Sequence, residues 1–153
     1  MVVITPCNTL LSLLFSPPGY TFMLKITRKV EYGLIALRHL QEQDDGVLSS
    51  AKKISEQYGI PYELLAKTLQ RLARVGIIGA VQGPAGGYKL LVDPGTINMT
   101  HFFEILEGPM GIMDCYFEIG CEQLDTCNIR SPINKINDII RNVFNNMTLA
   151  DIA

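Results

Sequence analysis

The chain of 153 residues is 48% hydrophobic and only 18% charged, which excludes a disordered chain and leaves enough apolar side chains for one globular domain with an accessory element. Of its four cysteines, Cys7 lies far from the other three, so the paired pattern of a small secreted protein is missing and we expect a reducing, cytoplasmic environment.

The net charge of −2 hides an asymmetry between the two halves of the chain. Residues 23–92 carry ten Lys or Arg against six Asp or Glu, a balance of +4, whereas residues 93–153 carry three against nine, a balance of −6. A basic half joined to an acidic half indicates a nucleic-acid-binding unit attached to a segment with another role. A basic face that is merely solvated would give the same count.

The first 22 residues, MVVITPCNTLLSLLFSPPGYTF, match neither a secretory signal nor a membrane span. A signal peptide begins with a positively charged region, but no Lys or Arg precedes the apolar part here. The run TLLSLLF is also much shorter than the ~20 residues that cross a bilayer. We therefore expect residues 1–22 to be a poorly ordered leader or a wrongly assigned start, Met23 to begin the functional chain, and no contact with a membrane.

Two helices are expected next. Apolar residues recur every three or four positions over residues 26–40, and Thr27 is a suitable N-cap for this first helix. Either Ser49 or Ser50 can cap the second helix, which Gly59 ends.

A third helix begins with Pro61 at its first position, buries Leu65, Leu69 and Leu72, and ends at Gly76. Its exposed face is expected to carry Lys67, Thr68, Gln70, Arg71 and Arg74. These side chains can donate hydrogen bonds to phosphates and to base edges in the major groove. A short glycine-containing turn before such a helix indicates a helix-turn-helix, although any small helical bundle would share the apolar pattern.

A β-hairpin follows, with residues 77–81 extended, a Gly- and Pro-rich tip at residues 83–87, and residues 88–92 returning. Glycines at the tip let the backbone come close to a phosphate. The expected fold is therefore mainly α with a small β-hairpin, a winged helix-turn-helix. The alternative is an ordinary hairpin packed on a helical bundle.

The motifs MLKITRKVEYGLIAL, ISEQYGIPYELLAKTLQRLARVGII and GPAGGYKL, followed by three cysteines, resemble the IscR/NsrR-type winged-helix transcription regulators that carry an iron–sulfur cluster. The resemblance extends from Met23 to about Met147. It divides the chain into the leader 1–22, a winged helix-turn-helix DNA-binding domain 23–92, a connecting helix and cysteine loop 93–130, and a dimerisation helix and tail 131–153.

The resemblance implies that the third helix and the wing contact a double-stranded DNA operator. We expect Lys67, Gln70 and Arg71 in the major groove, and Arg28, Lys29, Lys52 and Arg74 on phosphates. Several relatives carry an Arg just before the Gly-Pro of the wing, where this chain has Gln82, so minor-groove contacts should be weaker. The expected DNA-contacting residues are Arg28, Lys29, Lys52, Tyr62, Lys67, Gln70, Arg71, Arg74, Gln82, Gly83, Pro84, Gly86, Gly87 and Tyr88.

Cys115, Cys121 and Cys127 are spaced six positions apart, so a straight helix would not bring them to one face. They converge only if the segment wraps, which Gly111 and Gly120 permit. Structural zinc usually needs closely paired ligands, and no C-x2-C pair is present. Three thiolates plus one outside ligand suit an iron–sulfur cluster of [2Fe-2S] or [4Fe-4S] type. Zinc, a disulfide, reduced thiols or a thiol switch remain alternatives.

The resemblance also bears on the fourth ligand. IscR-like relatives have a His three residues after the last cysteine, where this chain has Arg130, which stays protonated and cannot bind iron. In the nitric-oxide-sensing branch an acidic residue near the amino terminus of the other subunit completes the site, and Glu31 falls on that position. We therefore expect the three cysteines to act with Glu31 of the partner subunit. The alternative is a solvated Glu31 paired with Arg28, and His39 and His101 are outside candidates.

Two further helices are expected in the acidic half. A short core helix contains Phe102 and Leu106 and ends at Gly108, and a long one starts with Ser131 as its cap. The long helix repeats apolar residues at near-heptad spacing, namely Ile133, Ile136, Ile140, Val143 and Met147. Such a helix packs on its own domain or on a second copy. The resemblance favours a homodimer, which presents two recognition helices to a palindromic site.

We therefore expect a homodimeric transcriptional regulator, a repressor, that senses nitric oxide, redox or iron–sulfur status through its cysteines. One alternative is a cluster-free winged-helix regulator controlled by a small molecule, thiol oxidation or a partner protein. Another is an electron-transfer protein with a cluster and no role on DNA. Enzyme chemistry is not expected, because the two His lie in separate helices with no evident nucleophile.

Overall fold

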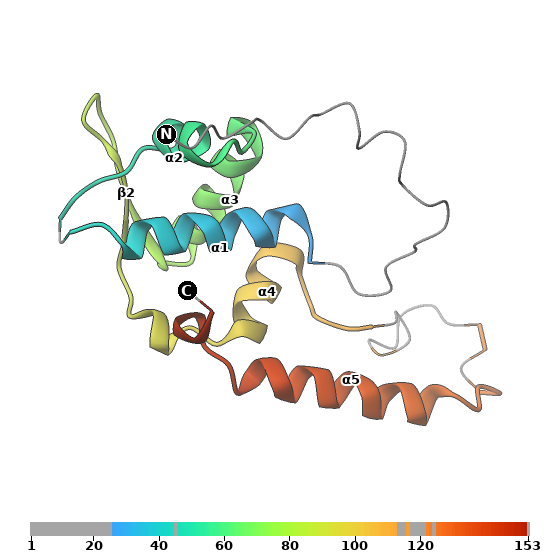
Figure 1. The fold of residues 1–153 in the computed structure, drawn as a ribbon. Coiled ribbons are helices and arrows are strands. Elements are labelled where there is room, and N and C mark those ends of the chain that lie inside the picture. Colours follow the sequence, from blue (N-terminus) through green and yellow to red (C-terminus); the bar gives the residue numbers. More distant parts are fainter. Residues whose placement is uncertain (1–25, 45, 113–115, 117–121, 124, 153) are drawn as a thin grey trace, which may run out of the picture.

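A computed structural model describes residues 26–44, 46–112, 116, 122–123 and 125–152 (Figure 1). The elements in chain order are α1 Arg28–Gln41, α2 Ala51–Tyr58, α3 Tyr62–Arg74, β1 Ile78–Val81, β2 Gly87–Leu90, η1 Pro94–Thr96, α4 Met99–Glu107, α5 Arg130–Asn145 and η3 Leu149–Asp151, where η marks a short 3-10 helix. The expected mainly α fold with one small hairpin is confirmed. The predicted leader 1–22 lies outside the described residues. None of the described helices combines the length and the apolar character that a membrane span needs.

The ends of the first two helices follow from local side-chain chemistry. The Thr27 side chain accepts a hydrogen bond from the backbone N–H of Val30, and the Ser50 side chain accepts one from Lys53, as N-caps do. Gly59 ends α2 with φ of 64°, in the left-handed region that favours glycine. The predicted caps are thus confirmed at Thr27, Ser50 and Gly59.

Two helix starts differ from the prediction. Pro61 is the cap before α3 and not its first residue, because its ψ of 119° is outside the helical region. The predicted cap Ser131 lies inside α5. The backbone N–H of Ile133 donates to the Ile129 carbonyl at 3.0 Å, so the first turn begins before Ser131 and includes it.

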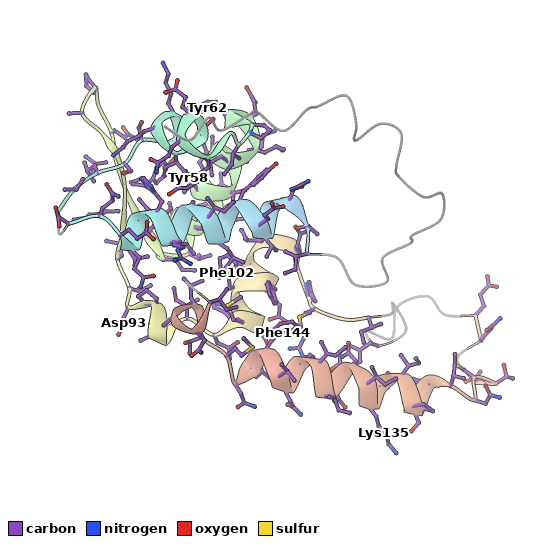
Figure 2. All side chains as sticks on the ribbon, in the orientation of Figure 1. Tyr58, Tyr62, Asp93, Phe102, Lys135 and Phe144 are labelled. Atoms are coloured by element: carbon purple, nitrogen blue, oxygen red, sulfur yellow. The ribbon has the colours of Figure 1, made fainter. Side chains whose placement is uncertain are left out.

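The core lies where α1, α3 and α4 meet. Leu37, Leu65, Leu69 and Leu72 are almost completely buried, and Phe102 projects from α4 toward α1 (Figure 2). Helices α1 and α4 approach closely because α1 carries a glycine, Gly33, at their contact. A Cβ there would lie 2.8 Å from Cδ1 of Leu106.

The hairpin is tied to the helical body by one short backbone bridge. Strands β1 and β2 pair in antiparallel register from Ile78 opposite Leu90 to Val81 opposite Gly87. Ser49, just before α2, exchanges two backbone hydrogen bonds of 3.0 and 2.9 Å with Tyr88 of β2. The wing is therefore held against the segment that leads into the helix-turn-helix.

Helix α5 lies on the far side of α4 from α1 and is mostly exposed (Figure 1). Phe144 packs edge-on against Phe103 of α4, with ring centroids 4.9 Å apart, while Asn137 is the one fully buried residue of the helix. Along the predicted apolar seam, Ile136 and Val143 are 47% and 53% exposed, and Ile139 beside them is 62% exposed. After α5 the chain returns to the body and buries Leu149. An unpaired apolar face of this kind suits a second copy of the chain.

We predict that Gly87→Ala destabilises the protein. A Cβ at Gly87 would lie 2.8 Å from the carbonyl carbon of Ser49, and backbone atoms cannot move aside as a side chain can. Urea unfolding should show a loss of about 1–3 kcal/mol. Gly95→Ala is the control, because its Cβ would meet nothing closer than 3.4 Å and should change stability by less than about 0.5 kcal/mol. Equal effects at the two positions would contradict the close approach.

Candidate nucleic-acid interface and metal centre

The turn between α2 and α3 is fixed by two hydrogen bonds and one buried side chain. The Ser55 hydroxyl donates to the Ile60 carbonyl at 2.6 Å, and the Ile60 N–H donates to the Ser55 carbonyl at 3.0 Å. Ile60 itself is 5% exposed. Because these bonds fix the backbone of the turn, the start of α3 has a defined position relative to α2.

The exposed face of α3 carries Lys67, Gln70, Arg71 and Arg74, as predicted, and Tyr62 is exposed at its start. Thr68 was predicted on the same face, and that prediction is wrong. Its side chain is buried at 4%, its hydroxyl donates to the Leu64 carbonyl at 2.9 Å, and its methyl group faces the open position beside Gly33 of α1.

Arg71 makes a structural contact that the sequence did not predict. One of its guanidinium nitrogens donates to the Leu106 carbonyl, at the end of α4, at 3.2 Å. A carbonyl near a helix C-terminus carries partial negative charge and suits a cation. A role for Arg71 at base edges, which stays a prediction, would require this bond to α4 to break or to share the guanidinium.

The wing presents its tip and buries its base. Gln82, Gly83 and Pro84 are exposed, whereas Gly87 is buried against Ser49 and Tyr88 is half-buried. Burial, with a smaller effect from the nearby Tyr62, raises the pKa of Tyr88 above its ordinary value, so its phenol stays neutral.

Several predicted phosphate contacts are paired with acids. Arg28 lies 2.6 Å from Glu31, which raises the pKa of Arg28 above its ordinary value, Lys29 lies 3.2 Å from Glu107, and Lys52 lies 3.9 Å from Glu56. These pairs are largely exposed and contribute little to stability, so a phosphate could displace the acid.

Lys67 and Arg74 differ from these basic residues. They take part in none of the ion pairs that the described residues form. Both are exposed on α3, so each could contact a phosphate without giving up one of these pairs, Lys67 in place of the base edges predicted for it.

Only part of the predicted metal centre can be located. Cys115 and Cys121 lie outside the described residues, as does Cys7, whereas Cys127 is half-buried three residues before α5 begins. Glu31 is in the first turn of α1, with its side chain 41% exposed and bound to Arg28. Within the described part of the chain, no three His, Cys, Asp or Glu side chains gather in a metal-binding group. The predicted ligand set therefore stays a prediction.

The outside candidates for a fourth ligand occupy different surroundings. His39 is 2% exposed, and both of its ring nitrogens have hydroxyl partners. His101 lies on the exposed face of α4. Neither belongs to a group of three or more potential metal ligands within the described residues.

The segment that leads to the cysteines is fastened to α5. Arg141 donates from one guanidinium nitrogen to the Glu104 carboxylate at 2.9 Å and to the Met110 carbonyl at 2.8 Å. Asn137 accepts a hydrogen bond from the N–H of Ile112 at 3.0 Å. Sequence reasoning missed these contacts. The available signal was Asn137, a polar residue within the apolar pattern of α5, but its partner Ile112 lies 25 residues away.

The end of α4 also contacts the start of α1. Glu107 accepts from the Thr27 hydroxyl and pairs with Lys29. Beside these residues, a cavity of about 470 Å³ opens between α1, α4 and α5, with a mostly apolar lining that includes Ile26, Val30, Phe103, Met110, Ile140 and Phe144. The last turn of α4 is thus the point where α1, α3 and the segment before the cysteines come together.

Comparison with known proteins gives a consistent result. Residues 26–153 match the family model Rrf2, described as an iron-dependent transcriptional regulator. Among solved structures, CymR (YrzC), the global cysteine regulator of B. subtilis, is 26% identical, with a TM-score of 0.67 over 85% of this chain and 96% of that one. The oxidized form of Staphylococcus aureus CymR is 25% identical, with a TM-score of 0.64 over 82% and 93%. T. potens IscR is 27% identical, with a TM-score of 0.64 over 84% and 85%.

We predict that Arg141→Ala destabilises the protein by about 1–3 kcal/mol, because the Met110 carbonyl loses its side-chain donor and the half-buried Glu104 carboxylate keeps only the 3.4 Å bond from the Met110 N–H. The control is Arg38→Ala, whose partner Glu42 is more than half exposed and should cost less than about 1 kcal/mol. Both values come from urea unfolding. If Arg38→Ala cost as much as Arg141→Ala, the anchoring role of Arg141 would be wrong.

Proposed function

Because the chain belongs to the Rrf2 family of transcriptional regulators, we propose that it is a homodimeric, DNA-binding repressor in the cytoplasm, whose affinity for a palindromic operator depends on the state of its cysteines. Membership of this family makes the chain a regulator of transcription and gives no reason to expect an enzyme. The repressor activity, the palindrome and the sensing residues are the proposal.

The observation that carries the DNA-binding proposal is the pairing of a helix-turn-helix with a wing. Helix α3 offers a row of exposed donors beside a hairpin that projects from the body next to α2 (Figure 1). Such a helix fits the major groove, with Lys67 and Arg74 on phosphates and Gln70 at a base edge. The exposed tip, Gln82 to Pro84, then reaches the neighbouring backbone or minor groove.

The exposed apolar face of α5 supports the homodimer. Ile136, Ile139 and Val143 would bury their side chains against the same residues of a second copy, as in a two-fold interface. The apolar cavity beside Val143 would be partly closed by that copy. A dimer formed in this way holds two α3 helices at a fixed separation, which a palindromic site requires.

The donor set fits an iron–sulfur cluster. Cys115, Cys121 and Cys127 would supply three thiolates, and Glu31 of the partner subunit would supply a carboxylate that exchanges more readily. The Asn137 amide supports this fit. Its oxygen binds the N–H of Ile112, three residues before Cys115, while its nitrogen Nδ2 is buried with no acceptor among the described residues. A buried donor without a partner suits a nearby anionic group.

Such a cluster supplies, when bound, redox chemistry at thiolate-held iron. The residues of the chain carry the effect onward. Gly108 to Ile112 connect the cysteines to α4, Arg141 holds this segment on α5, and Arg71 joins the end of α4 to the recognition helix α3. A change at the cysteines therefore has a path of direct contacts to both the dimer helix and α3.

One observation favours a second candidate. The likeness to CymR, a global cysteine regulator with a structure in an oxidized form, supports control by cysteine status or thiol oxidation without a cluster. The DNA-binding part of the proposal is the same in both cases.

The cluster proposal predicts that protein purified without oxygen is brown and contains matched iron and sulfide. Cys121→Ala should lose the colour, because two thiolates do not hold the cluster, and Glu31→Ala should alter its spectrum or its reaction with nitric oxide. Cys7→Ala is the control and should leave all of these unchanged. A colourless, iron-free wild-type protein that binds DNA would overturn the cluster proposal and favour control of DNA binding by the cysteine thiols.

The DNA-binding proposal predicts that Lys67→Ala weakens binding to any duplex and lowers the slope of log Kd against log salt by about one, because one phosphate contact is lost. Fluorescence anisotropy at several salt concentrations measures both quantities. Lys135→Ala is the matched control, since Lys135 is exposed on α5 and points away from the rest of the protein (Figure 2). An unchanged salt slope for Lys67→Ala would contradict the proposed contact between α3 and the DNA.

A further inference from the structure

A buried histidine connects three parts of the DNA-binding half. His39 projects from α1 and is 2% exposed. Its Nδ1 lies 3.1 Å from the Tyr58 hydroxyl, and its Nε2 lies 3.0 Å from the Ser49 hydroxyl. Its ring also meets the ring of Tyr58 edge-on, with centroids 5.6 Å apart. The imidazole is therefore fixed in position from two sides.

One of its partners leads directly to the wing. Ser49 is 0% exposed and exchanges both backbone hydrogen bonds with Tyr88 of β2. The contact is tight, because Gly87 leaves no room for a Cβ against the Ser49 carbonyl. In the described part of the chain this is the only β-bridge between the hairpin and the rest of the protein. The Ile77 N–H, just before β1, also donates to the Leu72 carbonyl of α3, so Ser49 fixes the β2 side of the wing.

The other partner leads to the recognition helix. Tyr58 is the last residue of α2, directly before Gly59 and the short turn into α3. A hydrogen bond at this point fixes the end of α2 relative to α1. His39 thus holds the wing through Ser49 and the helix-turn-helix through Tyr58.

We propose that His39 is a positioning residue for DNA binding, which sets the wing at a fixed place relative to the recognition helix. The proposal rests on the proposed DNA-binding function. His39 does not itself reach the DNA, since it is buried beneath the loop that contains Ser49.

The chemistry of the imidazole suits this role. A neutral ring has one N–H donor and one bare nitrogen acceptor, and each hydroxyl partner can accept from the first or donate to the second. Burial, assisted by the positive charge of Lys53 on α2 and opposed by Glu42, lowers the pKa of His39 below its ordinary value of 6.5. The neutral ring is therefore the stable form near pH 7, and both of its hydrogen bonds are made without burying a charge.

The test compares His39→Phe, which keeps a ring and loses both hydrogen bonds, with Val30→Ala, a destabilising change in the same helix without contact to the wing. The DNA is a duplex selected by the wild-type protein from random sequences. We expect His39→Phe to bind this duplex roughly 3- to 10-fold more weakly, as for the loss of one or two hydrogen bonds. Its salt slope should also fall by about one, because the wing loses its phosphate contact. Val30→Ala should lower Tm and keep the salt slope.

Two more conservative variants test the same contact in case His39→Phe does not fold. Ser49→Ala removes only the hydroxyl next to the wing, and His39→Gln, which keeps one donor and one acceptor, should recover part of the affinity. A second measurement does not need DNA. Amide hydrogen exchange at Ser49 and Tyr88, whose N–H groups bind each other's carbonyls, should speed up in His39→Phe and stay as in wild type in Val30→Ala.

The outcomes separate this inference from the proposed function. If wild type binds DNA and His39→Phe matches it in affinity, salt slope and exchange, the positioning role is wrong and the function stands. If wild type selects no duplex, the proposed function fails, and the exchange of Ser49 and Tyr88 still decides whether His39 fixes the wing.

Discussion

The hydrogen bonds of Arg141 are the constraint on which the rest of the account depends. From α5, this one guanidinium binds the Glu104 carboxylate of α4 and the Met110 carbonyl just beyond it. The chain between α4 and the cysteines therefore cannot move independently of the long helix. Since α5 exposes Ile136, Ile139 and Val143 to a second copy, the same interaction would link the cysteine segment to the dimer interface. A regulator needs such a link, because a change at a sensor matters only if it alters the spacing of two DNA-binding units.

The last turn of α4 extends this link into the DNA-binding half. Arg71 of the recognition helix binds the Leu106 carbonyl, and Glu107 binds Thr27 and Lys29 at the start of α1. These contacts are few and mostly exposed or half-buried, so their net strength is a few kcal/mol at most. Weak contacts of this kind can be exchanged without unfolding the core of leucines beneath them. The hydrogen bonds of His39 and the contacts at the end of α4 thus have opposite roles. Those of His39 fix the wing relative to the recognition helix, whereas those at α4 allow the DNA-binding half to shift relative to α5.

Local chemistry explains why much of the fold could be predicted from the sequence. Thr27, Ser50 and Gly59 cap helices through atoms within a few residues, and the hairpin follows from its glycine-rich tip. Apart from the helix starts at Pro61 and Ser131, the errors and omissions arise from distant partners. Thr68 is buried beside Gly33 of another helix, and Arg71 meets the Leu106 carbonyl across 35 positions. No periodicity within one segment contains that information. The predicted cysteine ligands rest on chemistry and resemblance, because Cys115 and Cys121 lie outside the described residues.

The most direct test of the central claim is the operator affinity of one protein preparation in two states, purified without oxygen and then stripped of iron by a chelator. The selected duplex and the salt concentration are kept the same. We expect the two affinities to differ by roughly 5- to 150-fold, the range of ordinary allosteric coupling. Iron-loaded and stripped protein that bind the operator equally well would contradict it, because the cysteine segment would then have no influence on the recognition helices.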